Sequence, residues 1–266
     1  MSNIQIQAGE PMLEFRLAYL RAVARSWQDE GFRDRLLDAT DIQPLLAKEF
    51  GLRTVWPYLD ISLQRSGDPN RQTVWKPLET AGWIGVDDAF EIVLPESPSA
   101  QATEALAAYY QLFPDFMGPT GVIDSGDQGS GKGQLGGSLP TGLGIPGGGA
   151  DSMLAFGGVV LRAIALAWEN ARFRAELLEY GKTDATQVLS QWLGYNSPFN
   201  FFLRFSTNPA LHWDAAQGQW NLKNPNGGLI KNSIVLNYPN APVETQLWPI
   251  ALTSYNNTGS AYPFTC

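Results

Sequence analysis

The side chains best suited to covalent chemistry lie at the end of the chain. The segment from Thr253 to Cys266 carries several hydroxyl groups and the only thiol, and its candidates for modification or crosslinking are Thr253, Ser254, Thr258, Ser260, Thr265 and Cys266. Such a group can attack the carbonyl carbon of the preceding residue and close an azoline ring. A single cysteine excludes an intrachain disulfide and a thiolate metal cluster. The alternative is an unmodified polar tail.

Other sequences that resemble reactive motifs lack an essential part. The segment Gly126–Gly133 is like a phosphate-binding loop, but Gly133 occupies the position where magnesium binding needs Ser or Thr. The residues that follow include Pro140 and several glycines and cannot form the required helix. His212 is the only histidine, which leaves a triad one candidate base and a histidine metal site too few ligands.

Two acidic pairs, Asp29-Glu30 and Asp87-Asp88, consist of sequence neighbours, whose side chains point in different directions on a helix or strand. Neither pair is therefore a convincing acid/base couple. We expect no catalytic residues, no metal and no cofactor, and interpret the chain as a non-enzyme.

Tryptophans recur at nearly equal spacing, as Trp75 with Trp83 and as Trp213 with Trp220. Exposed indoles offer large flat surfaces to a partner, so these four residues are candidate interaction aromatics. Filling of the core is the favoured alternative.

Composition narrows the range of partners. The 266 residues carry a net charge of -8, and the 18 Lys and Arg are scattered, which argues against nucleic acid. The longest apolar stretch, Met153–Trp168, contains Arg162 and is too short to cross a membrane. The first residues show no Sec-type signal, so we expect synthesis in the cytoplasm and leave export by a dedicated machine open. Only 17% of residues are charged, which suits a surface covered by neighbours, as in a homo-oligomer or filament.

The elements that position these residues occur twice. Arg21–Trp27 is repeated as Arg162–Trp168, Leu46–Gly51 as Leu189–Gly194, and Ile92–Leu94 as Ile234–Leu236. Two copies indicate a duplicated domain and not a solenoid. We therefore predict a first repeat over 1–117, a glycine-rich linker over 118–150, and a second repeat with the C-terminal tail over 151–266.

Each repeat is predicted to begin with three short helices, because apolar residues recur at helical spacing and Gly51 and Gly194 suit helix ends. Short segments rich in branched and aromatic residues follow and indicate strands. Helix 100–112 closes the first repeat, whereas Pro249 is expected to interrupt the matching segment of the second. The predicted fold class is α+β, with two tandem copies of a helical unit followed by a small irregular sheet.

The segment Ala167–Leu178, repeated in weaker form over Ser26–Leu37, resembles the opening helices of the nitrile hydratase alpha subunit. The metal-binding cysteines of that enzyme are missing, so the resemblance points to its non-catalytic relatives, the leader domains of ribosomal natural-product precursors. More narrowly, the chain resembles the tandem precursors of thiazole/oxazole-modified microcins (TOMM bacteriocins) of Burkholderia-type bacteria. That resemblance implies a leader bound by a cyclodehydratase complex and a C-terminal core whose Cys, Ser and Thr become azoles.

Two hypotheses follow. The first is a non-enzymatic precursor protein modified between Thr253 and Cys266. The second is a self-assembling subunit of a filament, tube or sheath, because heterologous contacts that do not close into a ring propagate into fibres.

Overall fold

The computed structural model describes residues 11–53, 56–69, 72–76, 82–85, 88–112, 150–180, 184–197 and 201–257. The predicted linker, apart from Ala150, lies outside the described residues, and so does the segment 258–266. The phosphate-loop-like segment belongs to that linker.

Each repeat begins with three helices, as predicted. They are α1 (Pro11–Ser26), α2 (Glu30–Asp38) and α3 (Gln43–Phe50) in the first repeat, and α7 (Ala150–Glu169), α8 (Ala171–Tyr180) and α9 (Thr186–Leu193) in the second. The second helix of each unit is capped alike: the side chain of Asp29 accepts the N–H of Phe32, and that of Asn170 accepts the N–H of Phe173. These caps satisfy N–H groups that have no partner within a helix.

The third helix of each unit ends at the predicted glycine. Gly51 and Gly194 have φ angles of 74° and 68°, in the left-handed region that side chains with a Cβ rarely adopt. Their N–H groups donate to carbonyls of the preceding turn. The chain therefore turns out of both helices in the same way.

The principal sheet contains strands from both repeats. Its members are β1 (Leu59–Gln64), β4 (Ala89–Leu94), β5 (Phe202–Thr207) and β8 (Asn232–Asn237). Their order is β1-β8-β4-β5, in which the outer pairs β1/β8 and β4/β5 are parallel and the central pair β4/β8 is antiparallel. The prediction of a separate small sheet in each repeat was therefore wrong for these four strands. Alternation of apolar residues specifies the buried face of a strand but not its partner.

A second kind of sheet does follow the repeats. The first repeat contains the antiparallel pair β2 (Val74–Lys76) and β3 (Gly82–Ile84), and the second contains β6 (Trp213–Asp214) and β7 (Gln219–Trp220). Both pairs are short, and each places two tryptophans opposite one another.

Each repeat also closes with a helix. These are α5 (Ala102–Leu112) in the first repeat and α10 (Trp248–Asn257) in the second, where the 3-10 turn η3 (Thr245–Leu247) precedes α10. The predicted interruption at Pro249 was wrong, because Pro249 is the second residue of α10. Proline is tolerated in a first helical turn, where its missing N–H has no partner to lose.

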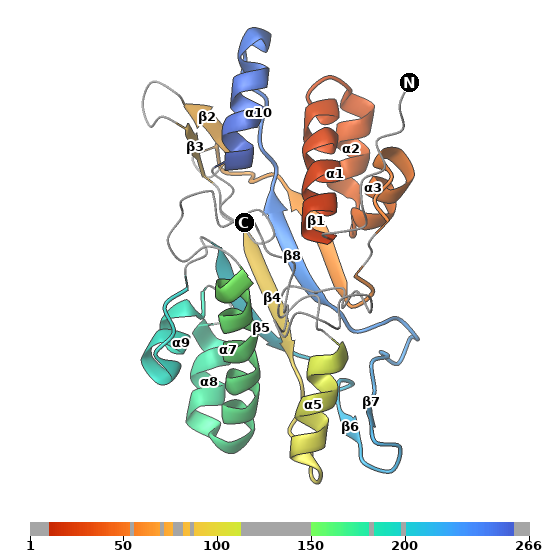
Figure 1. The fold of residues 1–266 in the computed structure, drawn as a ribbon, viewed down its shortest axis with the longest axis vertical. Helices are drawn as coiled ribbons and strands as arrows, with labels where there is room; N and C mark the ends of the chain where they lie inside the picture. Colours follow the sequence, from red (N-terminus) through yellow and green to blue (C-terminus); the bar gives the residue numbers. More distant parts are fainter. Residues whose placement is uncertain are drawn as a thin grey trace, which may run out of the picture.

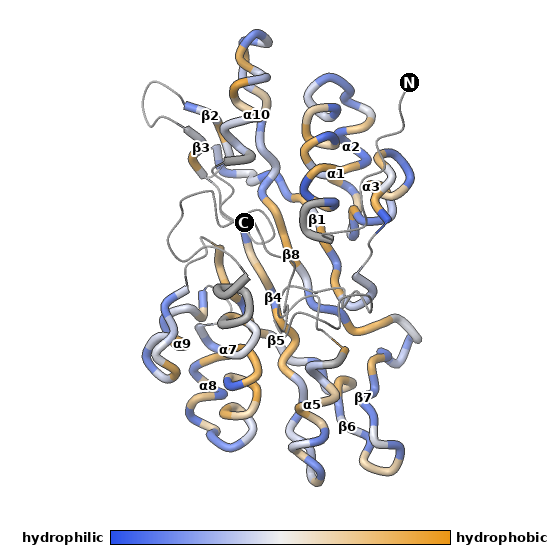
Figure 2. Tube along the Cα trace, in the orientation of Figure 1, coloured by the Kyte–Doolittle hydropathy of each residue, from blue (hydrophilic) through white to orange (hydrophobic). Residues whose placement is uncertain are grey.

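The elements form two lobes joined through the sheet (Figure 1). One lobe holds α1–α3, β2, β3 and α10, and the other holds α5, α7–α9, β6 and β7. Hydrophobic residues follow the strands of the sheet and the helical segments packed near them (Figure 2). One buried hydrophobic cluster includes residues of both repeats. Within the described residues, no helix has the length and apolar character needed to cross a membrane.

Candidate functional site

Two of the six candidate modification residues are among the described residues. Thr253 and Ser254 lie on the helix, and the Thr253 hydroxyl is exposed and donates to the carbonyl of Pro249 at 2.9 Å. Thr258, Ser260, Thr265 and Cys266 lie beyond the described residues.

The helix that carries this segment is held by aromatic residues of the first repeat. The indole N–H of Trp83 in β3 donates to the carbonyl of Ala251 at 2.8 Å. The rings of Trp83 and Tyr255 meet edge to face, with centroids 5.3 Å apart. The hydroxyls of Tyr255 and Tyr19 of α1 lie 3.2 Å apart in the interior. α10 is therefore anchored to a strand and a helix of the other repeat.

Equivalent contacts hold α5, and we call each such set of aromatic contacts around a closing helix a seat. The indole N–H of Trp220 in β7 donates to the carbonyl of Ala105 at 2.8 Å, and its ring meets that of Tyr109 edge to face. Trp220 belongs to the second repeat and α5 to the first. The same contact thus occurs twice: a tryptophan of one repeat donates a hydrogen bond to the closing helix of the other.

The four candidate interaction aromatics fall into two kinds. Trp83 and Trp220 are buried in the seats just described, so they fill the core while contacting the opposite repeat. Trp75 and Trp213 are half-buried and lie opposite them on the neighbouring strands. Trp213 donates to the side-chain oxygen of Gln101 at 3.0 Å. Of these four indoles, only Trp75 and Trp213 are open enough to meet an external partner.

Two further tryptophans were missed as contact residues, although they mark the sequence repeat. Trp27, directly after α1, donates to the carbonyl of Pro239 at 2.8 Å, and Trp168 of α7 donates to the carbonyl of Pro95 at 3.0 Å. Each proline follows a central strand of the opposite repeat. The recurrence of a tryptophan at the end of the first helix was the available signal.

Burial controls the ionisation of the tyrosines in the seats. Burial raises the pKa of Tyr19, and the neighbouring Tyr255 raises it further. The pKa of Tyr255 is raised by burial and then by the nearby charge of Asp88. Burial also raises the pKa of Tyr109. All three phenols therefore remain neutral well above the ordinary tyrosine range.

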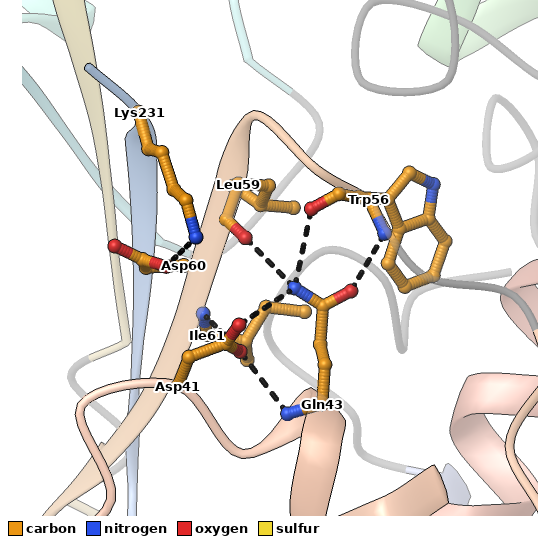
Figure 3. Close-up of polar contacts among 7 residues, drawn as sticks. All are labelled: Asp41, Gln43, Trp56, Leu59, Asp60, Ile61 and Lys231. Carbon is orange, nitrogen blue, oxygen red and sulfur yellow. Dashed lines mark hydrogen bonds and ion pairs between the residues drawn. The ribbon is translucent and has the colours of Figure 1, made fainter. Parts of the chain in front are cut away.

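A buried amide fixes the first helical unit to the sheet (Figure 3). The side-chain oxygen of Gln43 accepts the N–H of Trp56 at 2.7 Å, and its nitrogen donates to the carbonyl of Leu59 at 2.7 Å. Asp41 accepts the N–H groups of Gln43 and, more distantly, Ile61. In the second repeat, Asp184 accepts the equivalent N–H groups of Thr186 and Leu203.

An ion pair beside this network joins β1 to the residue that precedes β8. The ammonium of Lys231 lies 2.7 Å from the carboxylate of Asp60, and the two residues belong to different repeats (Figure 3). A second ion pair between the repeats joins Arg174 and Glu96 at 3.1 Å.

The remaining polar candidates have structural contacts. Asp29 caps α2, Glu30 pairs with Arg33, and Asp88 accepts the N–H of Asn237. His212 has an exposed side chain, and its backbone lies in a hydrogen-bonded turn. Asp87 lies outside the described residues. Among the residues that the structure describes, no three His, Cys, Asp or Glu side chains gather closely enough to hold a metal ion.

No curated protein and no solved structure matches the chain. A family model does match, twice, over residues 10–117 and 151–263, which together make up more than half of the sequence. Both matched regions contain one helical unit, the strands that follow it and one closing helix. The chain therefore belongs to the family described as "Ribosomal natural product, two-chain TOMM family".

Proposed function

We propose that this chain is a non-enzymatic precursor in which the two repeats serve as a leader body and the residues after α10 are the modified core. Its membership of a family of ribosomal natural products supports a precursor-type role. The reacting groups are the side chains of Thr258, Ser260, Thr265 and Cys266, and the modifying partner is a cyclodehydratase-type complex. The likeness of the opening helices to nitrile hydratase stays a prediction.

The observation that carries this assignment is the family match, and the structure adds that Thr253 and Ser254 lie within α10. When an azoline forms, the side-chain oxygen or sulfur bonds to the preceding carbonyl carbon, the carbonyl oxygen leaves as water, and the amide nitrogen loses its hydrogen. Inside a helix that N–H donates to the carbonyl four residues earlier. A ring at Thr253 or Ser254 would therefore remove a hydrogen bond from a helix whose Ala251 and Tyr255 are buried.

The helix itself supplies the connection between leader and core. α10 is fixed by the indole of Trp83 and the hydroxyl of Tyr19, both in the first repeat. A modifying complex that binds the folded repeats would therefore bind a body in which α10, the helix before the proposed core, has a fixed position. This arrangement supports a leader that acts as a folded domain and not as an extended peptide.

Mass spectrometry tests the proposal. The chain is produced with and without the cyclodehydratase complex of its own host, and ring positions are mapped by fragmentation. We expect the mass of one water to be lost for each ring, and only when the complex is present. The variant Cys266→Ala should lose one ring, whereas the matched variant Thr253→Ala should keep the full number. A ring at Thr253 or Ser254, or no loss of water with an active complex, would refute the assignment.

The filament hypothesis rests on composition and stays a prediction. The family match supports only the precursor role.

A further inference from the structure

The main sheet depends on pairing between the repeats. All three of its ladders, β1/β8, β8/β4 and β4/β5, join a strand of the first repeat to a strand of the second. A single repeat would therefore contribute two strands that have no partner from their own repeat in this sheet. Unpaired strand edges expose backbone N–H and C=O groups that either bind another chain or aggregate.

Side-chain hydrogen bonds also connect the two repeats, and they run in both directions. Four indole N–H groups donate to carbonyls of the opposite repeat, from Trp27 to Pro239, from Trp83 to Ala251, from Trp168 to Pro95 and from Trp220 to Ala105. Each repeat supplies two of the donors and two of the acceptors. The contact thus has the reciprocity of a dimer interface with an approximate two-fold axis.

The surfaces that would be exposed by separating the repeats are apolar. Tyr255 and Ala251 of α10 are buried against the first repeat, and Ala105 and Tyr109 of α5 are buried by equivalent contacts with the second. Obligate subunit interfaces are of this kind and resemble a domain core cut in half. A repeat without its partner would leave such a surface in water.

We propose that each repeat is an obligate binding partner of the other and that the peptide connection between them is not needed to hold the pair together. The partner that such a repeat recognises is a second domain of the same family, and each domain supplies two strands and one closing helix to the contact. The fold is a strand-exchanged dimer joined into one chain. This inference does not depend on any modification of the C-terminal residues.

A protease site inserted into the predicted linker of the full-length protein tests the inference. The protein is folded intact, cut completely, and applied to a sizing column under native conditions. We expect both fragments in one peak at the size of the uncut protein, and separation only in denaturant. Two separate peaks, or precipitation of either fragment after cutting, would overturn the proposal.

A matched pair of variants shows which contacts hold the cut protein together. Trp83→Phe keeps an aromatic ring in β3 but removes the hydrogen bond to Ala251 of the other repeat. Trp75→Phe changes the facing indole of the same strand pair, for which no such bond crosses to α10 among the contacts described. We expect Trp83→Phe to weaken association of the cut fragments about tenfold, the effect of one buried hydrogen bond. Equal effects of the two variants would contradict the assigned role of Trp83.

Discussion

Replacing Gln43 by leucine should destabilise the protein strongly, because the side chain is fully buried and bonded at both ends of its amide. Leucine has a similar size but leaves the N–H of Trp56 and the carbonyl of Leu59 without the 2.7 Å bonds that they now make. An unsatisfied buried group costs about 1–3 kcal/mol, so the two together should cost about 2–6 kcal/mol. That is a large part of the roughly 5–15 kcal/mol of a typical domain.

Urea unfolding followed by tryptophan fluorescence measures this loss, and the second repeat supplies the matched control. Thr186 occupies the position equivalent to Gln43, but its hydroxyl bonds to Asp184 at 2.7 Å in a part-buried setting. Thr186→Val should therefore cost only about 0.5–1.5 kcal/mol, the net value of an ordinary hydrogen bond. If Gln43→Leu cost no more than Thr186→Val, the reasoning from buried backbone partners would be refuted.

Two more predictions concern the tyrosines and the glycines. Burial raises the pKa of Tyr19, Tyr109 and Tyr255 above their unfolded values, so their contribution to stability is complete below about pH 10 and is lost as the pH rises beyond it. Unfolding midpoints in urea should fall above that pH, and Tyr255→Phe should flatten the fall; a midpoint that stayed constant would contradict the burial argument. Gly51→Ala and Gly194→Ala should each cost about 1 kcal/mol in the same assay, because an added Cβ meets no neighbour and only the positive φ is unfavourable. A much larger loss at either glycine would point to a contact that the backbone angle does not explain.

The helical parts of the fold were predictable because their signals are local. Apolar spacing around Phe15 and Phe156 indicated the first helices, and Gly51 and Gly194 marked the ends of the third. Strands around Ile92 and Ile234 were also recognised from their residue types. Their partners were not, because Ile92 and Ile234 alternate with half-buried residues in the same way whichever strand lies beside them.

For the candidate modification site, the sequence predicts residue types, and that prediction stays untested. The candidate residues at the end of the chain can be recognised because they carry hydroxyl or thiol groups. The helix boundary could not be predicted, because Pro249 indicated a break where α10 in fact begins. The buried hydrogen bonds of Gln43 could not be predicted from the sequence, because Trp56 and Leu59 lie next to Gln43 only in the folded chain. The contacts of Trp27 and Trp168 were likewise beyond local reasoning, since their acceptors belong to the opposite repeat.

At the centre of the sheet, equivalent positions of the two repeats lie opposite one another. Glu91 and Ser233 precede the matching segments Ile92–Leu94 and Ile234–Leu236, so they occupy equivalent positions, and they also face one another across β4 and β8. In a pair of identical domains this position would meet its own copy, and two first-repeat domains would set one glutamate against another. Like charges directly opposite are unfavourable in a sheet. The glutamate faces a serine here, so this position favours the mixed pair over a pair of first repeats.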